Sequence, residues 1–356
     1  MTFQQLEESF ESFERGTPRL NAIRDAIRQA DEKQDLKWRF WFRYDHIEES
    51  IFCGDRLHAL ITFPEMLQLY DESPTLQEDG QIAHSLLICF RWIVEAVTEF
   101  PSISRAQIDD YFRLFRKRLL EQGHSLNIYH HKRALYYLNV DKGIAAREFA
   151  RYLQTPFDSV SDGKAIGADF TAAYYLSIGE EEKALEAARP VFEGKLKAST
   201  LPMATYCDFL EYYLLEGLWE KARDIAERLE PRVKGDLYFL DSIGMLISLW
   251  SHEDVPRGIA LFNAHYDMYL ASKNPWLRVR FATGMAHLFA RIRDDALPLD
   301  DVRIPVNDPE PAALLASGDR AALSAWATAA AREQAAKFDD RNGSRYYMDL
   351  VDMLPT

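Results

Sequence analysis

Histidine and cysteine side chains are common metal ligands, and cysteine is also a common nucleophile. The only adjacent histidines are His130 and His131, and neighbouring positions on a helix face different ways, so we do not expect them to share a metal. The three cysteines, Cys53, Cys89 and Cys207, are odd in number and far apart, which predicts neither paired metal ligands nor a disulfide framework. We expect no metal, no cofactor and a reducing, cytoplasmic location.

Sequence motifs of common catalytic sites are missing. The chain has no phosphate-binding loop, no nucleophile elbow, no H-E-x-x-H pair and no C-x-x-C pair. Runs of carboxylates such as Glu180 to Glu182 are explained by the solvated start of a helix. We therefore expect a non-catalytic protein. An α-helical hydrolase is a remote alternative, since it would need a cluster of acids that faces inward.

A first basic stretch, LKWRFWFRYD at residues 36–45, alternates cations with aromatic rings. Trp38, Arg39 and Arg43 in this stretch could stack on bases or hold a peptide. The alternative is a helix buried between two neighbours, with arginine stems lying over apolar surface and charged heads in water.

A second basic stretch, RLFRKR at residues 113–118, lacks the interleaved aromatic pattern. Arg113, Arg116 and Lys117 share one helical face, while Arg118 points elsewhere. This face could bind an acidic partner, and the alternative is an ordinary solvated helix surface.

The charge balance disfavours nucleic acid as a partner. The 56 acidic and 42 basic residues give a net charge of −14, which repels phosphate backbones. The N-terminal stretch MTFQQLEESFESFERG is acidic and has no apolar core, so we expect no secretory signal. No apolar run approaches the roughly 20 residues of a membrane span, and we expect no membrane partner.

Small and aromatic residues recur in the middle of the chain with a step of 38 residues. A fixed period of roughly 20–50 residues predicts an array of stacked repeats. Two alanine series and two aromatic series share this step, with decay in the last unit. The alanines are Ala146, Ala184, Ala222 and Ala260, then Ala150, Ala188, Ala226 and Ala264; the aromatics are Tyr136, Tyr174, Tyr212 and Trp250, then Tyr137, Tyr175 and Tyr213.

Each repeat predicts an antiparallel pair of helices. The aromatic segment 168–179 has helical apolar spacing and ends at Gly179, after which acids open a second helix. Ala184 and Ala188 lie four apart on one face, where small side chains let the second helix approach the first closely. We interpret the repeated tyrosines as packing between helices, because every unit must pack against the next.

This pattern resembles the tetratricopeptide repeat over roughly residues 128–270. The resemblance lies in Gly179 with Ala184, Gly217 with Ala222, and the first-helix tyrosines Tyr137, Tyr175 and Tyr213. The chain departs from the family in its period of 38 rather than about 34, and in the second alanine, where the family has a bulky residue. The chain also resembles a group of Gram-positive bacterial tetratricopeptide-repeat proteins, through LHALITFPEMLQLYDESP, FPSISRAQIDDYFRLFRKRL, GEEEKALEAARPVFEGKL and AAKFDDRNGSRYY.

The resemblance implies an all-α fold, a right-handed α-solenoid of about seven stacked helix pairs. We expect N-terminal hairpins over 1–127, four 38-residue units over 128–275, and terminal helices over 276–356 with a long surface loop at 294–317. Pro64 should kink or break its helix. Ser104 to Gln107 fits a capping box, which opens the helix that follows it.

In tetratricopeptide arrays the first helices line the concave surface, and the resemblance implies a binding groove there. We expect this groove to hold an apolar or amphipathic protein or peptide segment, because the lysine and asparagine clamp for a peptide carboxylate is absent at the matching positions. The alternative is an intracellular peptide-sensing receptor without a DNA-binding domain; the oligomeric state stays open. The candidate groove residues are His131, Leu135, Leu138, Asn139, Asp169, Leu176, Ser177, Glu211 and Leu214, with Ala173, Cys207 and Leu215 beside them.

Overall fold

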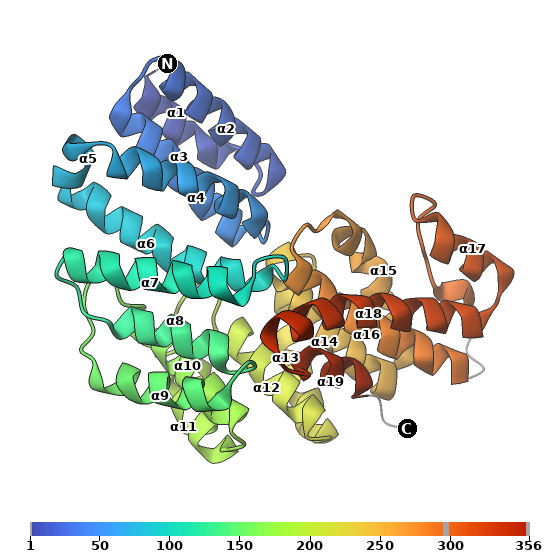
Figure 1. The fold of residues 1–356 in the computed structure, drawn as a ribbon. Helices are drawn as coiled ribbons and strands as arrows, with labels where there is room; N and C mark the ends of the chain where they lie inside the picture. The colour runs from blue at the N-terminus through green and yellow to red at the C-terminus, as the bar shows by residue number, and fades with distance from the viewer. Residues whose placement is uncertain (1, 295–298, 354–356) are drawn as a thin grey trace. The chain divides into compact units, whose positions relative to one another are not determined.

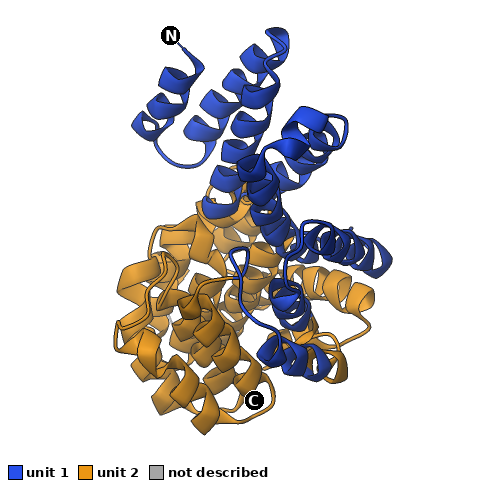
Figure 2. Cartoon of the chain, turned by 90° about the vertical axis from the view of Figure 1, so that its left-hand side faces the viewer, with its two compact units in different colours: residues 1–136, 146–161 blue, residues 137–145, 162–356 orange. Residues whose placement is uncertain are grey.

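The described residues of the computed structural model, 2–294 and 299–353, form α-helices and short 3-10 helices and contain no strand (Figure 1). The predicted all-α class is confirmed. The chain divides into two compact units: unit 1 contains residues 1–136 and 146–161, and unit 2 contains residues 137–145 and 162–356 (Figure 2).

Unit 1 is built from helices in which each packs against the next along the chain. α2 packs against α3, α3 against α4, and α6 against both α4 and α7. In its core Phe90 meets Phe63 edge to face, with ring centroids 4.8 Å apart, and stacks on Phe115 at 5.3 Å. Its helices are α1 Phe3–Ser9, η1 Phe10–Ser12, α2 Thr17–Glu32, α3 Leu36–Phe52, α4 Arg56–Asp71, α5 Pro74–Glu78, α6 Gly80–Ala96, η2 Val97–Glu99, α7 Arg105–Glu121 and most of α8 Asn127–Tyr137 and α9 Lys142–Gln154.

Two local predictions for unit 1 have different outcomes. The capping box is confirmed: Ser104 Oγ accepts a hydrogen bond from the Gln107 backbone N–H at 3.3 Å, and the Gln107 side chain accepts one from the Ser104 N–H at 2.9 Å. Pro64 does not break its helix, because α4 runs from Arg56 to Asp71 through it; the other outcome expected there, a kink, stays a prediction.

We expected no apolar stretch long enough to cross a membrane, and the segment that begins with α6 contradicts this expectation. Gly80–Glu99 passes that test by length and composition, with a mean hydropathy of 1.2. Half of this segment is buried inside the protein, as the core helix of a soluble protein is, so the test gives only weak evidence for a span.

Unit 2 contains three consecutive helix pairs, α10 with α11, α12 with α13, and α14 with α15. The first helix of each pair packs against the first helix of the next, and α16 continues this row beside α14. The helices are α10 Lys164–Ser177, α11 Glu181–Phe192, α12 Met203–Leu215, α13 Trp219–Val233, η3 Leu237–Phe239, α14 Leu240–Glu253, α15 Val255–Ala271, α16 Pro275–Asp294, η4 Leu299–Asp301, α17 Pro309–Ser317, α18 Arg320–Asn342 and α19 Tyr346–Asp352.

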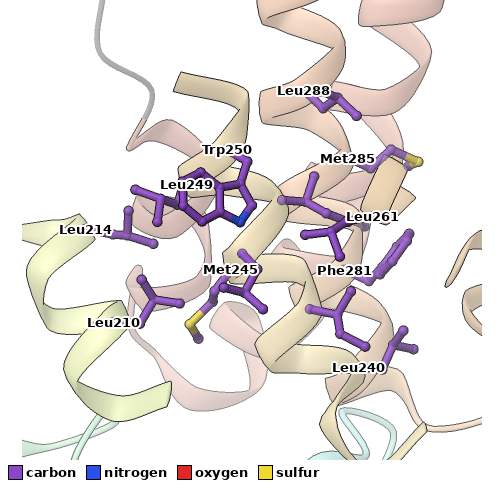
Figure 3. Close-up of a cluster of buried hydrophobic side chains, with 14 of the residues drawn as sticks. Leu210, Leu214, Leu240, Met245, Leu249, Trp250, Leu261, Phe281, Met285 and Leu288 are labelled. Carbon is purple, nitrogen blue, oxygen red and sulfur yellow. The ribbon is translucent and has the colours of Figure 1, made fainter. Parts of the chain in front are cut away.

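The core of unit 2 follows this row of helices. Figure 3 shows Leu210 and Leu214 of α12 facing Met245 of α14, with residues of α16 on the other side of α14. α14 and α16 approach so closely that a Cβ on Gly284 would overlap the backbone carbonyl of Gly244. Only glycine can occupy such a contact between two backbones.

The prediction that the repeated alanines lie where paired helices meet is confirmed in the two central units. Ala184 and Ala188 of α11, and Ala222 and Ala226 of α13, are completely buried where these helices meet their partners. Small side chains at these positions permit the close packing that the sequence predicts.

The alanine series is wrong in the two outer units. In α9, Ala146 is half-buried and Ala150 is exposed, while Phe149 is buried beside them. In α15, Ala260 and Ala264 are both exposed. The buried pairs are instead Ala145 with Phe149, and Gly258 with Phe262.

Changes in turn length explain this error. The buried small residues are 39 residues apart from Ala145 to Ala184, but 36 apart from Ala222 to Gly258. A Cβ on Gly258 would lie 3.2 Å from Leu288 Cδ1 and 3.3 Å from the Ser251 backbone nitrogen, so the smallest residue occupies the contact. The alanines that keep the 38-residue step face away from it.

The predicted surface loop at 294–317 is also corrected. It contains η4, and its last nine residues form α17, while residues 295–298 lie outside the described part of the chain. Pro309 and Pro311 occupy the first turn of α17, where a missing N–H costs nothing. These prolines therefore start a helix here, and Gly318 ends it in the left-handed conformation with φ 71°.

Candidate functional site

A groove with a volume of about 810 Å³ lies in unit 2. It is lined by the segment that follows α8, the C-terminal halves of α10 and α12, and the C-terminal helix α19. Its apolar lining includes Leu138, Leu176, Ile178 and Leu215. Its acidic lining consists of Asp208, Glu211, Glu216 and Asp349.

Helical spacing explains why these side chains meet. Asp208, Glu211, Tyr212 and Leu215 are three or four residues apart on α12, so they form one stripe that faces the groove. On α10, Ala173, Leu176 and Ser177 form the equivalent stripe.

Glycines end both of these helices beside the groove. Gly179 and Gly217 have φ values of 78° and 67°, a left-handed conformation that is strained for other residues. These turns return the chain sharply into α11 and α13. The groove therefore lies at the ends of two adjacent hairpins of unit 2.

Asp208 has an unusual electrostatic environment. Its side chain is half-buried, and in the described part of the structure it makes no hydrogen bond and no ion pair. Burial, and then the charges of Asp169 and Glu211, raise the pKa of this carboxyl well above its usual range.

Glu211 is held by two partners. Its Oε2 lies 2.7 Å from Nη1 of Arg280, a buried arginine of α16. The hydroxyl of Tyr346 on α19 donates to Glu211 Oε1 and accepts from Arg280 Nη2 at 2.9 Å. This network connects α12, α16 and α19, and it fixes one acid of the groove by charge-assisted hydrogen bonds.

Further contacts hold α19 as a wall of the groove. His287 of α16 donates from Nε2 to the Val351 carbonyl of α19 at 3.1 Å, and its Nδ1 lies 3.0 Å from Ser248 Oγ. Burial lowers the pKa of His287 to about 4, so the ring is neutral at pH 7. Nδ1 of the neutral ring then accepts from the serine hydroxyl.

The groove combines five of the nine groove residues predicted from the sequence: Leu138, Asn139, Leu176, Ser177 and Glu211. Leu214 does not line the groove; it lines a separate small cavity of about 10 Å³, together with Glu211 and Arg280.

Asp169 does not line the groove, and it accepts a hydrogen bond from Thr205 Oγ1 at 2.5 Å. Together with burial, its negative charge raises the pKa of Asp208, which does line the groove. His131 and Leu135 belong to unit 1, whereas the groove lies in unit 2. The cysteine considered beside them, Cys207, is buried and points to Asp241 and Met245 rather than into the groove.

Several groove residues were not predicted. The helical stripe from Glu211 back to Asp208 was available in the sequence as an i,i+3 pair, but the structure was needed to show that both acids face inward. Tyr212 was interpreted as a packing residue; it packs against the core of unit 2 and also lines the groove. Tyr346 and Asp349 come from α19, more than 120 residues from α12 in the chain, and no periodicity connects them.

The groove offers a ligand both apolar contacts and carboxylates.

No family model, no curated protein and no solved structure matches this chain. Within residues 2–294 and 299–353, no group of three histidine, cysteine, aspartate or glutamate side chains is placed to hold a metal ion.

The first basic stretch is occupied by contacts within unit 1. Trp38 packs against Phe42 with ring centroids 5.1 Å apart. Arg39 Nε lies 2.8 Å from Asp31, and the buried Arg43 pairs with Asp31 at 2.9 Å and with Glu65 at 3.2 Å. These contacts match the buried-helix interpretation of this stretch, because both arginines are already paired.

The second basic stretch lies exposed on α7. Arg113 pairs with Asp110, and Lys117 lies 3.5 Å from Glu121 on the same helix. Arg116 is exposed beside them. Exposed pairs of this kind contribute little to stability, and the arrangement matches a solvated helix face.

Proposed function

We propose that the protein is a non-catalytic binding scaffold whose unit 2 groove holds a segment of a protein or peptide. The observation that carries this proposal is the groove itself, with apolar side chains from α10 and α12 and carboxylates along the same face. Its volume of about 810 Å³ lies within the roughly 300–1,000 Å³ typical of ligand sites. An amphipathic segment matches this mixture, since its apolar side can bury Ile178 and Leu215, which are exposed in the groove.

We further propose that the chain is a right-handed α-solenoid of the tetratricopeptide type, with about seven helix pairs. Three consecutive hairpins of unit 2 support this, because their first helices α10, α12 and α14 pack in sequence. In such arrays the first helices face the concave side, and α10 and α12 supply most of the groove. The expected location is the cytoplasm.

A peptide-sensing receptor is a second candidate, and the position of α19 favours it. Tyr346 and Asp349 of this C-terminal helix line the groove, so a bound segment would contact α19 directly. Binding would then change the stability of α19 through the Tyr346 network with Glu211 and Arg280.

The remote hydrolase alternative needs inward-facing acids, and unit 2 contains such a group around Asp208. We favour binding because Glu211 is held in an ion pair and Asp169 in a hydrogen bond. Esterase, glycosidase and phosphatase substrates test this choice: turnover by the wild type that is lost in Asp208→Asn would favour the hydrolase.

The proposed binding function can be tested with a library of random 12-residue peptides displayed against the full chain. Selected peptides are then measured against the wild type and against an Ile178→Ser, Leu215→Ser double variant. Both side chains are exposed in the groove, so their loss should leave the fold intact. Leu185→Ser is the matched control, because Leu185 is 40% exposed, against 42% for Leu215, and lies outside the groove.

We expect the double variant to bind selected peptides about tenfold more weakly, since two truncated apolar contacts cost about 1 kcal/mol or more together. Leu185→Ser should bind like the wild type. If no peptide is selected, or if both variants bind like the wild type, the groove is not a binding site for peptides and the proposal fails.

A further inference from the structure

We propose that the segment held in the groove presents a basic side chain, arginine or lysine, to Asp208, with apolar residues beside it. This inference rests on the proposed function and specifies the chemistry of the occupant. Asp208 lines the groove and has no partner of its own within the described residues. A carboxylate in a half-enclosed apolar site is costly unless a charged or hydrogen-bonding group meets it.

The other acids around Asp208 are already satisfied. Asp169 of α10 accepts from Thr205, and Glu211 of α12 is bound by Arg280 and Tyr346. Asp241 of α14 lies beside Cys207, with Sγ to Oδ2 at 3.7 Å. Asp208 therefore lies among three carboxylates that are accounted for, and it is the one without a counter-group.

The cations of unit 2 near the groove are engaged elsewhere. Arg280 of α16 is paired with Glu211 and lies under the rings of Trp276 and Tyr346, with its Cζ 5.5 and 5.4 Å from their centroids. Lys142 lines the groove, and its Nζ donates to the Ser177 carbonyl at 2.8 Å. Among the described residues these two cations are bound to other groups, and Arg280 acts on Asp208 only through its charge, so the bound segment can supply the direct counter-charge.

The surroundings of Asp208 also fit the stem of a basic residue. Ala173, Leu176 and Leu215 line the same groove and offer apolar surface to a methylene chain. Tyr212 follows Asp208 by four residues on α12, so its ring lies on the same stripe, where a cation can stack on an aromatic face. Apolar contact with the stem and charge contact with the head select arginine or lysine over a purely apolar residue.

Proton linkage follows from this geometry. In the empty groove, burial and the charges of Asp169, Glu211 and Asp241 favour the protonated form of Asp208, while Arg280 opposes them. Tyr346 and Asp349 of α19 are the remaining titratable groups on the opposite wall. A basic side chain binds the ionised form, so binding releases the proton and becomes tighter as the pH rises.

Peptides selected on the full chain test the inference. We expect the selected sequences to contain an arginine or lysine next to apolar residues. Replacing that arginine by citrulline, which has the same shape and no charge, should weaken binding to the wild type about tenfold or more. The same replacement should have little effect on binding to Asp208→Asn, because the variant has no charge at that position.

Glu216→Gln is the matched variant, since Glu216 is an exposed acid at the rim of the same groove. Glu216→Gln should still bind the citrulline peptide more weakly than the arginine peptide. It should also bind the arginine peptide more tightly as the pH rises from 5 to 8, as the wild type does and Asp208→Asn does not. An equal loss in both variants would show a general charge effect and overturn the assignment to Asp208.

The two proposals fail in different ways. If selected peptides depend on Ile178 and Leu215 but show no enrichment of basic residues, the cation site is wrong and the binding groove stands. If no groove-dependent peptide is found, the proposed function fails and the inference fails with it. Unfolding temperatures of each variant show whether a loss of binding comes from a loss of fold.

Discussion

The guanidinium of Arg280 lies 2.7 Å from the carboxylate of Glu211, and this pair of a buried arginine and a half-buried glutamate joins α16 to α12 at the groove. Tyr346 completes the network from α19. The groove is therefore shaped by an ion pair between helices that are distant in the chain. Asp208, a second acid of the groove on the same helix, has no such partner within the described residues.

Arg280→Met should destabilise the protein. Loss of the arginine leaves the half-buried Glu211 without its counter-charge, and we expect a cost of unfolding free energy below the roughly 3–5 kcal/mol of a fully buried pair. Urea denaturation measures this difference. Arg345→Met is the control, because Arg345 is exposed and pairs with Asp349 only at the surface, at 3.3 Å. Equal losses in both variants would contradict the role of this pair.

Gly284→Ala should be among the most destabilising single-methyl changes in unit 2. The added Cβ would overlap the Gly244 carbonyl, so α14 and α16 would have to separate, at a cost of about 1–3 kcal/mol or more. Gly163→Ala is the matched control, since its Cβ would meet nothing within 4 Å. Thermal unfolding compares the two. A small effect at Gly284 would show that the helices are not this close.

Asp208→Asn should stabilise the ligand-free protein. The pKa of Asp208 is higher in the folded protein than its value of about 3.9 in the unfolded chain. The free energy of unfolding therefore falls as the pH rises above that value, because the folded protein disfavours the ionised carboxylate. Asparagine cannot ionise, and we expect a gain of about 0.5–2 kcal/mol at pH 8 and less at pH 5. Calorimetry at both pH values decides this. A destabilised variant would show that Asp208 has a structural partner.

Acid should destabilise the protein through its buried histidines. The pKa of His287 is about 4 in the folded protein, because burial disfavours the cation, and about 6.5 in the unfolded chain. The unfolded chain therefore binds more protons between these values, and stability present above pH 6.5 is lost as the pH falls toward 4. The loss is on the order of 3 kcal/mol for this residue.

Denaturant unfolding across pH 4–7 tests this effect. His287→Gln should show a smaller dependence on pH than the wild type. Part of the dependence should remain, because His46 in unit 1 is also buried, with a pKa lowered to about 4. An unchanged slope in His287→Gln would mean that the ring does not stay neutral in the fold.

Periodicity predicted the helical class and the central hairpins of unit 2 well. Apolar spacing, a terminal glycine and paired alanines are local signals, and they are correct for α10 to α13. The same signals failed in α9 and α15, where turns of different length shift the buried face. A fixed 38-residue step assumes turns of constant length. When a turn gains or loses one or two residues, the position 38 residues on moves by roughly 100° or more around its helix and leaves the buried face.

The candidate site could be predicted only in part. Leu176 and Glu211 were expected from their positions on first helices, and they line the groove. Tyr346 was not expected, because its position depends on how the C-terminal helix folds back over α16. The distinction between a paired acid such as Glu211 and an unpaired one such as Asp208 also requires the three-dimensional arrangement of arginines.

The most direct test of the binding groove is site-specific photocrosslinking of a selected peptide. A benzophenone amino acid is introduced in place of Tyr212 in the groove or of Phe157, an exposed residue of unit 1. We predict that the peptide crosslinks at position 212 and not at position 157, and that excess unlabelled peptide prevents the crosslink. Crosslinking at 157 alone, or at neither position while the peptide is bound, would contradict a binding site in the groove.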